Sequence, residues 1–213
     1  MRKLALFVSL LAAATVVEAG SYDPLEDLVS TAKKEINASE AIEQSKDRVL
    51  NNPRAEKMKK GYWQFFQAKS GAKPGEFCMA VYWQMGRMIS ITGPGGDYRG
   101  AMLGFVAVEP KPPFPRPDNP KDIQKVKVTL TQGNDPSATV TALNRTVGAF
   151  ADEIQFPVPT IEAALAGMED ALNFRIEYQG SNIFELEWHS GLAARDMMKK
   201  CLQGENVNGK EVL

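Results

Sequence analysis

The chain has 213 residues, a formal net charge of −1 at pH 7 and 44% hydrophobic residues. Basic and acidic residues are nearly equal in number, 25 against 26, and are mixed along the chain. Nucleic-acid binding depends on an excess of positive charge that neutralises phosphates, so this balance argues against a nucleic-acid partner. The length is that of one domain, with room for an N-terminal appendage.

Residues 1–19 predict a cleaved signal peptide. A short basic start precedes an apolar run over Leu4–Val17, and small residues in Val17-Glu18-Ala19 occupy the positions that a signal peptidase reads. A membrane anchor is the alternative, but the run falls short of the roughly 20 apolar residues that cross a bilayer. We therefore expect a periplasmic or secreted protein of a bacterial type, with no stable membrane span after cleavage.

Residues 20–60 predict a helical N-terminal arm. Asp23-Pro24 is typical of a helix start, and apolar residues recur at helical spacing from Leu25 to Ile36. The apolar stripe is narrow and the segment is rich in Lys, Glu, Asp and Ala. The arm is therefore interpreted either as mobile or as a helix that lies on its own domain, and a partner-binding helix is a third reading. The basic run at residues 57–60 predicts a solvated linker.

Residues 61–203 predict a β-rich globular domain. From Tyr62 the apolar period changes to two, which is typical of strands. Strands separated by turns are expected at Trp63–Ala68, Phe77–Trp83, Met85–Thr92 and Arg99–Val108. The last of these is apolar on both faces, which predicts a central strand that is covered on each side.

The second half of the chain alternates turns with further strands. Glu109–Lys121 carries six prolines, which predicts a stiff surface connection. Thr160 and Ser190 are expected to cap two helices, and the tail, residues 204–213, is polar and expected to fray. The remaining strands are expected at 125–131, Ala138–Leu143, Asn173–Gln179 and Asn182–Trp188.

These elements together predict an α+β fold. The fold is an antiparallel β-sheet or sandwich with packed helices, preceded by the N-terminal helical arm. Several turns of hairpin type favour the antiparallel pairing.

Two cysteines in an exported chain predict one disulfide, Cys78–Cys201. Helical spacing puts Cys201 on the same face as Ala194 and Met198, which is the buried face of the last helix. Two separate buried thiols are the alternative. The bond would tie the central sheet to the last helix and would contribute about 4–5 kcal/mol in the chain-entropy account.

The chain offers little for catalysis, for a metal or for a cofactor. His189 is the only histidine, so a triad or a histidine-based metal site has at most one imidazole. Sequence neighbours seldom aim at each other, so His189 and Ser190 are interpreted as a strand end and a helix cap. Glu177, Glu185 and Glu187 on the last hairpin are interpreted as a solvated face, with a hydrolytic pair as the alternative.

The stretch Gly93–Gly100 is the candidate binding loop. It is rich in glycine, but it lacks the Gly-Lys-Ser/Thr signature and the following helix of a phosphate-binding loop. A β-turn is the simpler interpretation. The functional interpretation is a ligand- or partner-binding loop that uses Asp97, Tyr98 and Arg99, because loops on a rigid sheet often carry binding residues.

Residues at both ends of the β region resemble small exported proteins of alphaproteobacteria, of the invasion-associated locus B type. The residues that carry the resemblance are Trp63, Phe77-Cys78, Phe184-Glu185-Leu186, Gly191-Leu192-Ala193-Ala194 and Cys201-Leu202. The resemblance implies a secreted β-sandwich with disulfides and implies no site residues. The helical arm and the proline-rich segment depart from it.

The leading hypothesis is a non-enzymatic exported binding or interaction protein whose partner is an unknown protein or small ligand of the envelope. A carboxylate-dependent hydrolase and an envelope structural component are the alternatives. A pocket with two converging carboxylates of shifted pKa would favour the hydrolase. A filled core with an exposed apolar patch would favour the binding protein.

Overall fold

The computed structural model describes residues 25, 55–108, 114–147 and 151–213. The predicted signal peptide, and the arm apart from Leu25 and its last six residues, lie outside the described residues. The strands are β1 (Tyr62–Gln67), β2 (Cys78–Gln84), β3 (Arg87–Thr92), β4 (Ala101–Val108), β5 (Gln124–Gln132), β6 (Ala138–Val147), β7 (Ala151–Val158), β8 (Leu172–Tyr178), β9 (Ser181–Trp188) and β10 (Glu211–Val212). The helices are α4 (Ala55–Lys60) before β1, α5 (Ile161–Ala166) between β7 and β8, and α6 (Gly191–Leu202) between β9 and β10.

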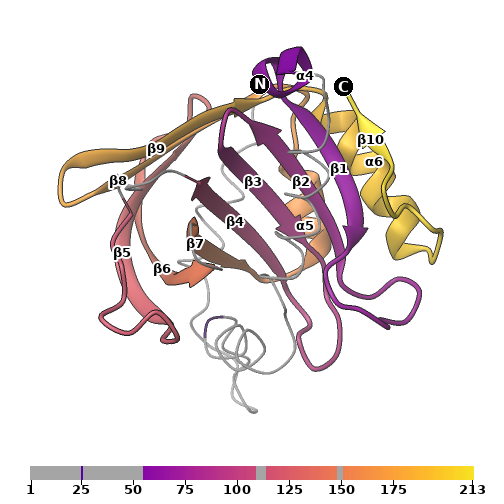
Figure 1. Cartoon of the computed structure of the whole chain (residues 1–213), viewed down its shortest axis with the longest axis horizontal. Helices are drawn as coiled ribbons and strands as arrows, with labels where there is room; N and C mark the ends of the chain where they lie inside the picture. Colours follow the sequence, from indigo (N-terminus) through magenta and orange to yellow (C-terminus); the bar gives the residue numbers. More distant parts are fainter. Residues whose placement is uncertain (1–24, 26–54, 109–113, 148–150) are drawn as a thin grey trace.

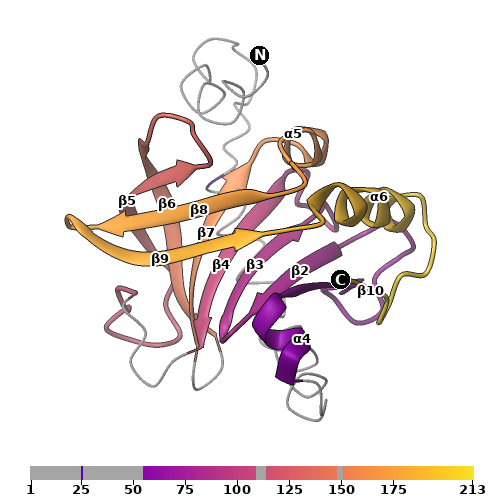
Figure 2. The ribbon, with the colours of Figure 1, turned by 90° about the horizontal axis from the view of Figure 1, so that it is seen from above.

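The described strands form one sheet in the order β10-β1-β2-β3-β4-β7-β6-β5-β8-β9, and every neighbouring pair is antiparallel. The sheet curls into a half-barrel, so that the β8–β9 hairpin crosses over β2–β4 (Figures 1 and 2). Two long-range hydrogen bonds close the curl: Arg87 Nη1 donates to the Glu185 carbonyl at 2.8 Å, and Trp63 Nε1 donates to the His189 carbonyl at 2.7 Å. The predicted antiparallel sheet is confirmed, as one curled sheet.

The concave face of the sheet holds a filled aromatic core. Trp63 of β1 lies 5.2 Å from Trp188 of β9, and Phe105 of β4 lies 5.4 Å from Phe174 of β8, measured between ring centroids. Helices α5 and α6 close this core, with Ala194 and Met198 fully buried on the inner face of α6. Aromatic pairs at these spacings stabilise a core beyond the area that they bury.

The other face of β1–β4 is also apolar and buried. Tyr62, Trp83, Met88 and Val106 form a second cluster there, and Met58 of α4 and Leu25 pack on it. Strand β4 lies between β3 and β7 and is buried over both faces, which confirms the predicted central strand. A strand covered on both faces needs apolar residues at consecutive positions, as β4 has.

The C-terminal tail is docked, so the prediction that it frays is wrong. Val207 is buried, and β10 pairs with β1 through Trp63↔Val212. Asn208 Oδ1 accepts a hydrogen bond from the Gln67 amide at 3.0 Å. The tail is ordered because it satisfies the backbone groups along the outer edge of β1.

The end of the predicted arm also belongs to the domain. Helix α4 is basic, but Lys57 is only 9% exposed and forms an ion pair with Glu211 of β10. The Met58 carbonyl accepts a hydrogen bond from the Met85 amide at 3.2 Å. A solvated linker is therefore the wrong description for Lys57, although Lys59 and Lys60 are exposed.

The proline-rich segment is anchored at its C-terminal half. Phe114 is buried in the concave core, where its ring lies 6.0 Å from that of Phe184. Arg116 Nε lies 2.6 Å from the fully buried carboxylate of Asp152. The prediction of a surface connection is wrong at Phe114, because its side chain packs into the apolar core inside the curled sheet. Residues 109–113 lie outside the described residues.

Candidate functional site

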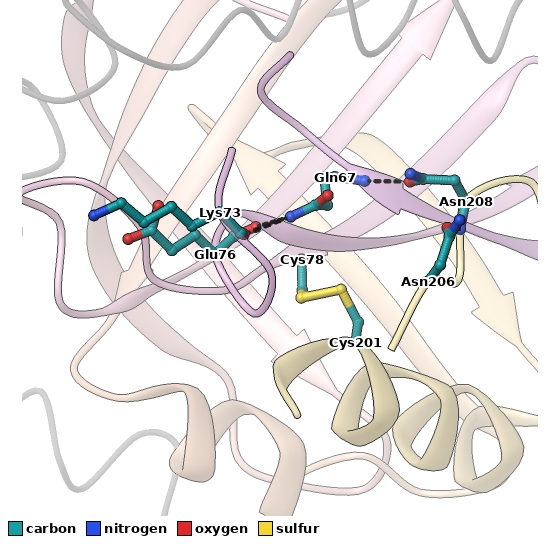
Figure 3. The surroundings of a disulfide bond; sticks show 7 residues. All are labelled: Gln67, Lys73, Glu76, Cys78, Cys201, Asn206 and Asn208. Atoms are coloured by element: carbon teal, nitrogen blue, oxygen red, sulfur yellow. Dashed lines mark hydrogen bonds between the residues drawn. A yellow bond between two sulfur atoms is a disulfide. The ribbon is translucent and has the colours of Figure 1, made fainter. Parts of the chain in front are cut away.

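The predicted disulfide is present and fixes the last helix to the sheet. Cys78 at the start of β2 and Cys201 near the end of α6 are bonded, with Cα atoms 5.8 Å apart and 123 positions between them in the sequence. Figure 3 shows Cys201 pointing from α6 toward Cys78, beneath the turn held by Gln67. Gln67 Nε2 donates to the carbonyls of Lys73 and Glu76 at 2.8 and 2.9 Å. The C-terminal turn of α6 is thus held at the sheet.

A groove of about 390 Å³ lies between α5 and α6. It is lined by Ile161, Glu162, Leu165, Ala166, Arg195, Lys199, Leu202 and Gln203. The buried Ile161 and Leu165 and the half-buried Leu202 give it an apolar floor. Its volume falls within the roughly 300–1,000 Å³ of sites for small molecules.

The α6 side of the groove is cationic. Arg195 and Lys199 are one helical turn apart, and Asp196 lies 3.7 Å from the first and 3.8 Å from the second. Arg195 Nε is buried and has no hydrogen-bond partner among the described residues. Asp196 is 63% exposed, so water competes for its carboxylate. Glu162, on α5, is the only acidic residue among those that line the groove.

Local sequence features hold the floor of the groove in place. Helix α5 begins after Thr160, whose Oγ1 accepts a hydrogen bond from the Ala163 amide at 3.1 Å, so the predicted cap is confirmed. Beneath the groove, a Cβ at Gly93 would lie 3.3 Å from Leu202 Cδ2 and 3.7 Å from Ile161 Cδ1. The Gly93 amide donates to the Cys78 carbonyl at 2.7 Å. The floor therefore lies directly over the disulfide-bearing strand.

The predicted binding loop is a β-turn that lies apart from the groove. Gly95 and Tyr98 exchange two backbone hydrogen bonds of 3.0 and 3.1 Å. Tyr98 is buried, and its hydroxyl donates to the Ala101 carbonyl at 2.7 Å, so its side chain is part of the core. Asp97 and Arg99 are exposed, and their role in binding stays a prediction. Within the stretch Gly93–Gly100, Gly93 lies against the floor of the groove.

His189 and Ser190 do contact each other, against the sequence argument, but as part of a structural network. His189 Nδ1 lies 3.1 Å from Ser190 Oγ, and His189 Nε2 lies 2.9 Å from the Lys60 carbonyl. Ser190 Oγ donates to the Leu213 carbonyl at 2.9 Å. Ser190 precedes α6 in a left-handed conformation with no side-chain cap, so the predicted cap is wrong. The pair joins the ends of α4, β9 and β10.

The carboxylates of the last hairpin lie on a solvated face, as predicted. Glu177 is paired with Arg175 at 2.8 Å, Glu185 accepts from Asn182 at 2.9 Å, and Glu187 is exposed. Within residues 55–108, 114–147 and 151–213, no group of three or more His, Cys, Asp and Glu residues could hold a metal ion. A hydrolytic site needs two carboxylates that flank a substrate, and a hydrolytic role for this hairpin stays a prediction.

Burial raises the pKa of two tyrosines, which predicts loss of stability at alkaline pH. The pKa of Tyr62 rises to about 12, first by desolvation and then by Glu211, and desolvation likewise raises the pKa of Tyr82 to about 12. An unfolded tyrosine ionises near pH 10. The stabilisation is therefore complete below about pH 10 and is lost as the pH rises toward 12.

The measurement is absorbance of tyrosinate against pH in the folded protein and in the protein unfolded by denaturant. We expect two tyrosines to ionise about two pH units later in the folded protein, and Tyr62→Phe to remove one of the two. Superimposable folded and unfolded titrations would contradict the burial of both hydroxyls.

Comparison with known proteins assigns no family to the chain. No family model, no curated protein and no solved structure matches it. The resemblance to the invasion-associated locus B type therefore stays a prediction. No helix within the described ranges is long and apolar enough to cross a membrane.

Proposed function

We propose that this protein is an exported, non-enzymatic binding protein, and that its ligand lies in the groove between α5 and α6. The observation that carries the proposal is a groove with an aliphatic floor and two cationic side chains, Arg195 and Lys199, along one wall. The side chains of Arg195 and Lys199 are 30% and 52% exposed, so both can meet an anionic ligand whose apolar part lies on the floor.

The disulfide supports the export half of the proposal. Disulfides persist in oxidising compartments such as the periplasm and the extracellular space. The Cys78–Cys201 bond also restrains the α6 side of the groove, because Cys201 directly precedes Leu202 of the floor. A preformed site loses less conformational entropy on binding than one that must be ordered.

Native mass spectrometry of the protein purified from its exported fraction tests the proposal. We expect a chain that begins at Gly20 and carries a co-purified small molecule. Ala166→Trp should remove that molecule because it fills the groove from α5. Ala193→Trp is the matched control, since Ala193 is exposed on α6 and does not line the groove. A bound mass that persists in the Ala166→Trp protein, or Met1 at the N-terminus, would contradict the corresponding half of the proposal.

A further inference from the structure

The shape of the groove limits the ligand to a slender apolar chain. Helix α5 has six residues, so its wall extends about 9 Å at the usual rise of 1.5 Å per residue. That is too short to seat an amphipathic helix along its length. The floor of Ile161, Leu165 and Leu202 is aliphatic and contains no aromatic ring. An unbranched aliphatic chain matches this surface.

The charges at the groove indicate which end group the aliphatic ligand has. Arg195 and Lys199 both line the groove with partly exposed side chains, and they lie one helical turn apart on α6. Asp196, the counter-ion of Arg195 in the structure, lies 3.7 Å from Arg195 Nε, which is beyond hydrogen-bond distance. A ligand carboxylate in the groove can form charge-assisted hydrogen bonds with the accessible part of the Arg195 guanidinium and with the Lys199 ammonium group.

Glu162 restricts the charge of that end group. Its carboxylate belongs to the opposite wall, so the wall residues carry two positive charges and one negative charge. This acidic side chain would repel a dianionic group such as a phosphate monoester more strongly than a group with a single negative charge.

We propose that the groove binds an aliphatic carboxylate of the fatty-acid class, with the chain over Ile161, Leu165 and Leu202 and the carboxylate at Arg195 and Lys199. This inference rests on the proposed function, and it names the ligand class of the same site. Neither the turn at Asp97–Arg99 nor the network around His189 takes part in it.

Calorimetric titration of the mature protein with decanoate and with decan-1-ol, each below its aggregation concentration, tests the inference. The two probes share the chain and differ in charge. We expect decanoate to bind at least about tenfold more tightly than decan-1-ol, which is the ratio that one charge-assisted hydrogen bond confers. Arg195→Gln should weaken the binding of decanoate much more than that of decan-1-ol and so remove most of this preference.

Lys200→Gln is the matched control, because Lys200 is an exposed cation of α6 outside the groove. It should leave the affinity for decanoate within about twofold, as expected for a screened surface charge. Equal affinity for the two probes, or an Arg195→Gln protein with unchanged preference, would overturn the carboxylate assignment and leave the groove as a binding site. Failure of decanoate to bind would also overturn it, whereas the proposed function would still be judged by the co-purified mass and its loss in Ala166→Trp. Thermal melting of each variant verifies that it is folded.

Discussion

Replacing Cys78 and Cys201 together with alanine is expected to lower the free energy of unfolding by about 4–5 kcal/mol, because the bond closes a very long loop in the unfolded chain. The two residues are 123 positions apart, and both are buried between β2 and α6. A domain of this size should then melt about 10–15 °C lower. The loss comes mainly from the entropy that the unfolded chain regains once the cross-link is gone.

Urea unfolding of the mature oxidised protein and of the double variant provides the measurement. Thiol titration of the unreduced, denatured protein should find no free thiol. Cys78→Ala alone serves as the control, and it should be about as destabilising as the double substitution because either change removes the same cross-link. Equal unfolding midpoints for the oxidised protein and the double variant would contradict the assigned role of the bond.

Removal of the disulfide is also expected to weaken ligand binding in the groove. Without it, the last turn of α6 is held by packing and backbone hydrogen bonds alone, and Leu202 of the floor follows Cys201 directly. The double variant should therefore bind decanoate more weakly even at temperatures where it is fully folded. This links the stability of the fold to the geometry of the site.

Much of the sheet could be predicted because its signals are local. The consecutive apolar positions of β4 and the period-two alternation of β5 and β8 follow from which faces are buried. The cysteine pair could be predicted because the chain has only two. Each of these predictions depends on residues within one element or on a single possible pairing.

Strands β7 and β10 could not be predicted, because their stability comes from distant partners. In β7, Asp152, Glu153 and Gln155 interrupt the apolar pattern, yet all are buried. Asp152 is satisfied by Arg116, which is 36 positions away. In β10, Glu211 accepts a hydrogen bond from Gln64, which is 147 positions away. No pattern within either strand contains this information.

The groove was missed for a related reason. Arg195, Lys199 and Leu202 recur at helical spacing on one face of α6, and this signal is visible in the sequence. The opposing wall is α5, which has only six residues and ends before Gly167. Only the curl of the sheet and the disulfide bring the two helices to opposite sides of one groove. The interpretation of the Gly-rich turn as a binding loop came from its composition, but Tyr98 in that turn is a core residue.

Arg145→Met is expected to lower the free energy of unfolding by about 3–5 kcal/mol, because it leaves a buried carboxylate without its counter-ion. Arg145 Nε of β6 lies 2.7 Å from Glu153 Oε2 of β7, and their side chains are 10% and 3% exposed. Gln155 Nε2 donates to the other carboxylate oxygen of Glu153 at 3.0 Å. This carboxylate also lies over Gly104, where an added Cβ would come within 2.7 Å of Glu153 Oε1, so it has little freedom to turn toward solvent.

The double variant Arg145→Met/Glu153→Leu should recover most of this loss, because removing both charges removes the desolvation cost as well. Arg175→Met is the matched control. It breaks the Arg175–Glu177 pair, whose side chains are 47% and 34% exposed, and should cost less than about 1 kcal/mol. Equal losses for Arg145→Met and Arg175→Met in urea unfolding would contradict the burial of the first pair. If the double variant recovers its stability, the pair serves mainly to fix the register of β6 against β7. A slip of one strand by one residue would move its charge to the opposite, aromatic face of the sheet, away from the partner charge.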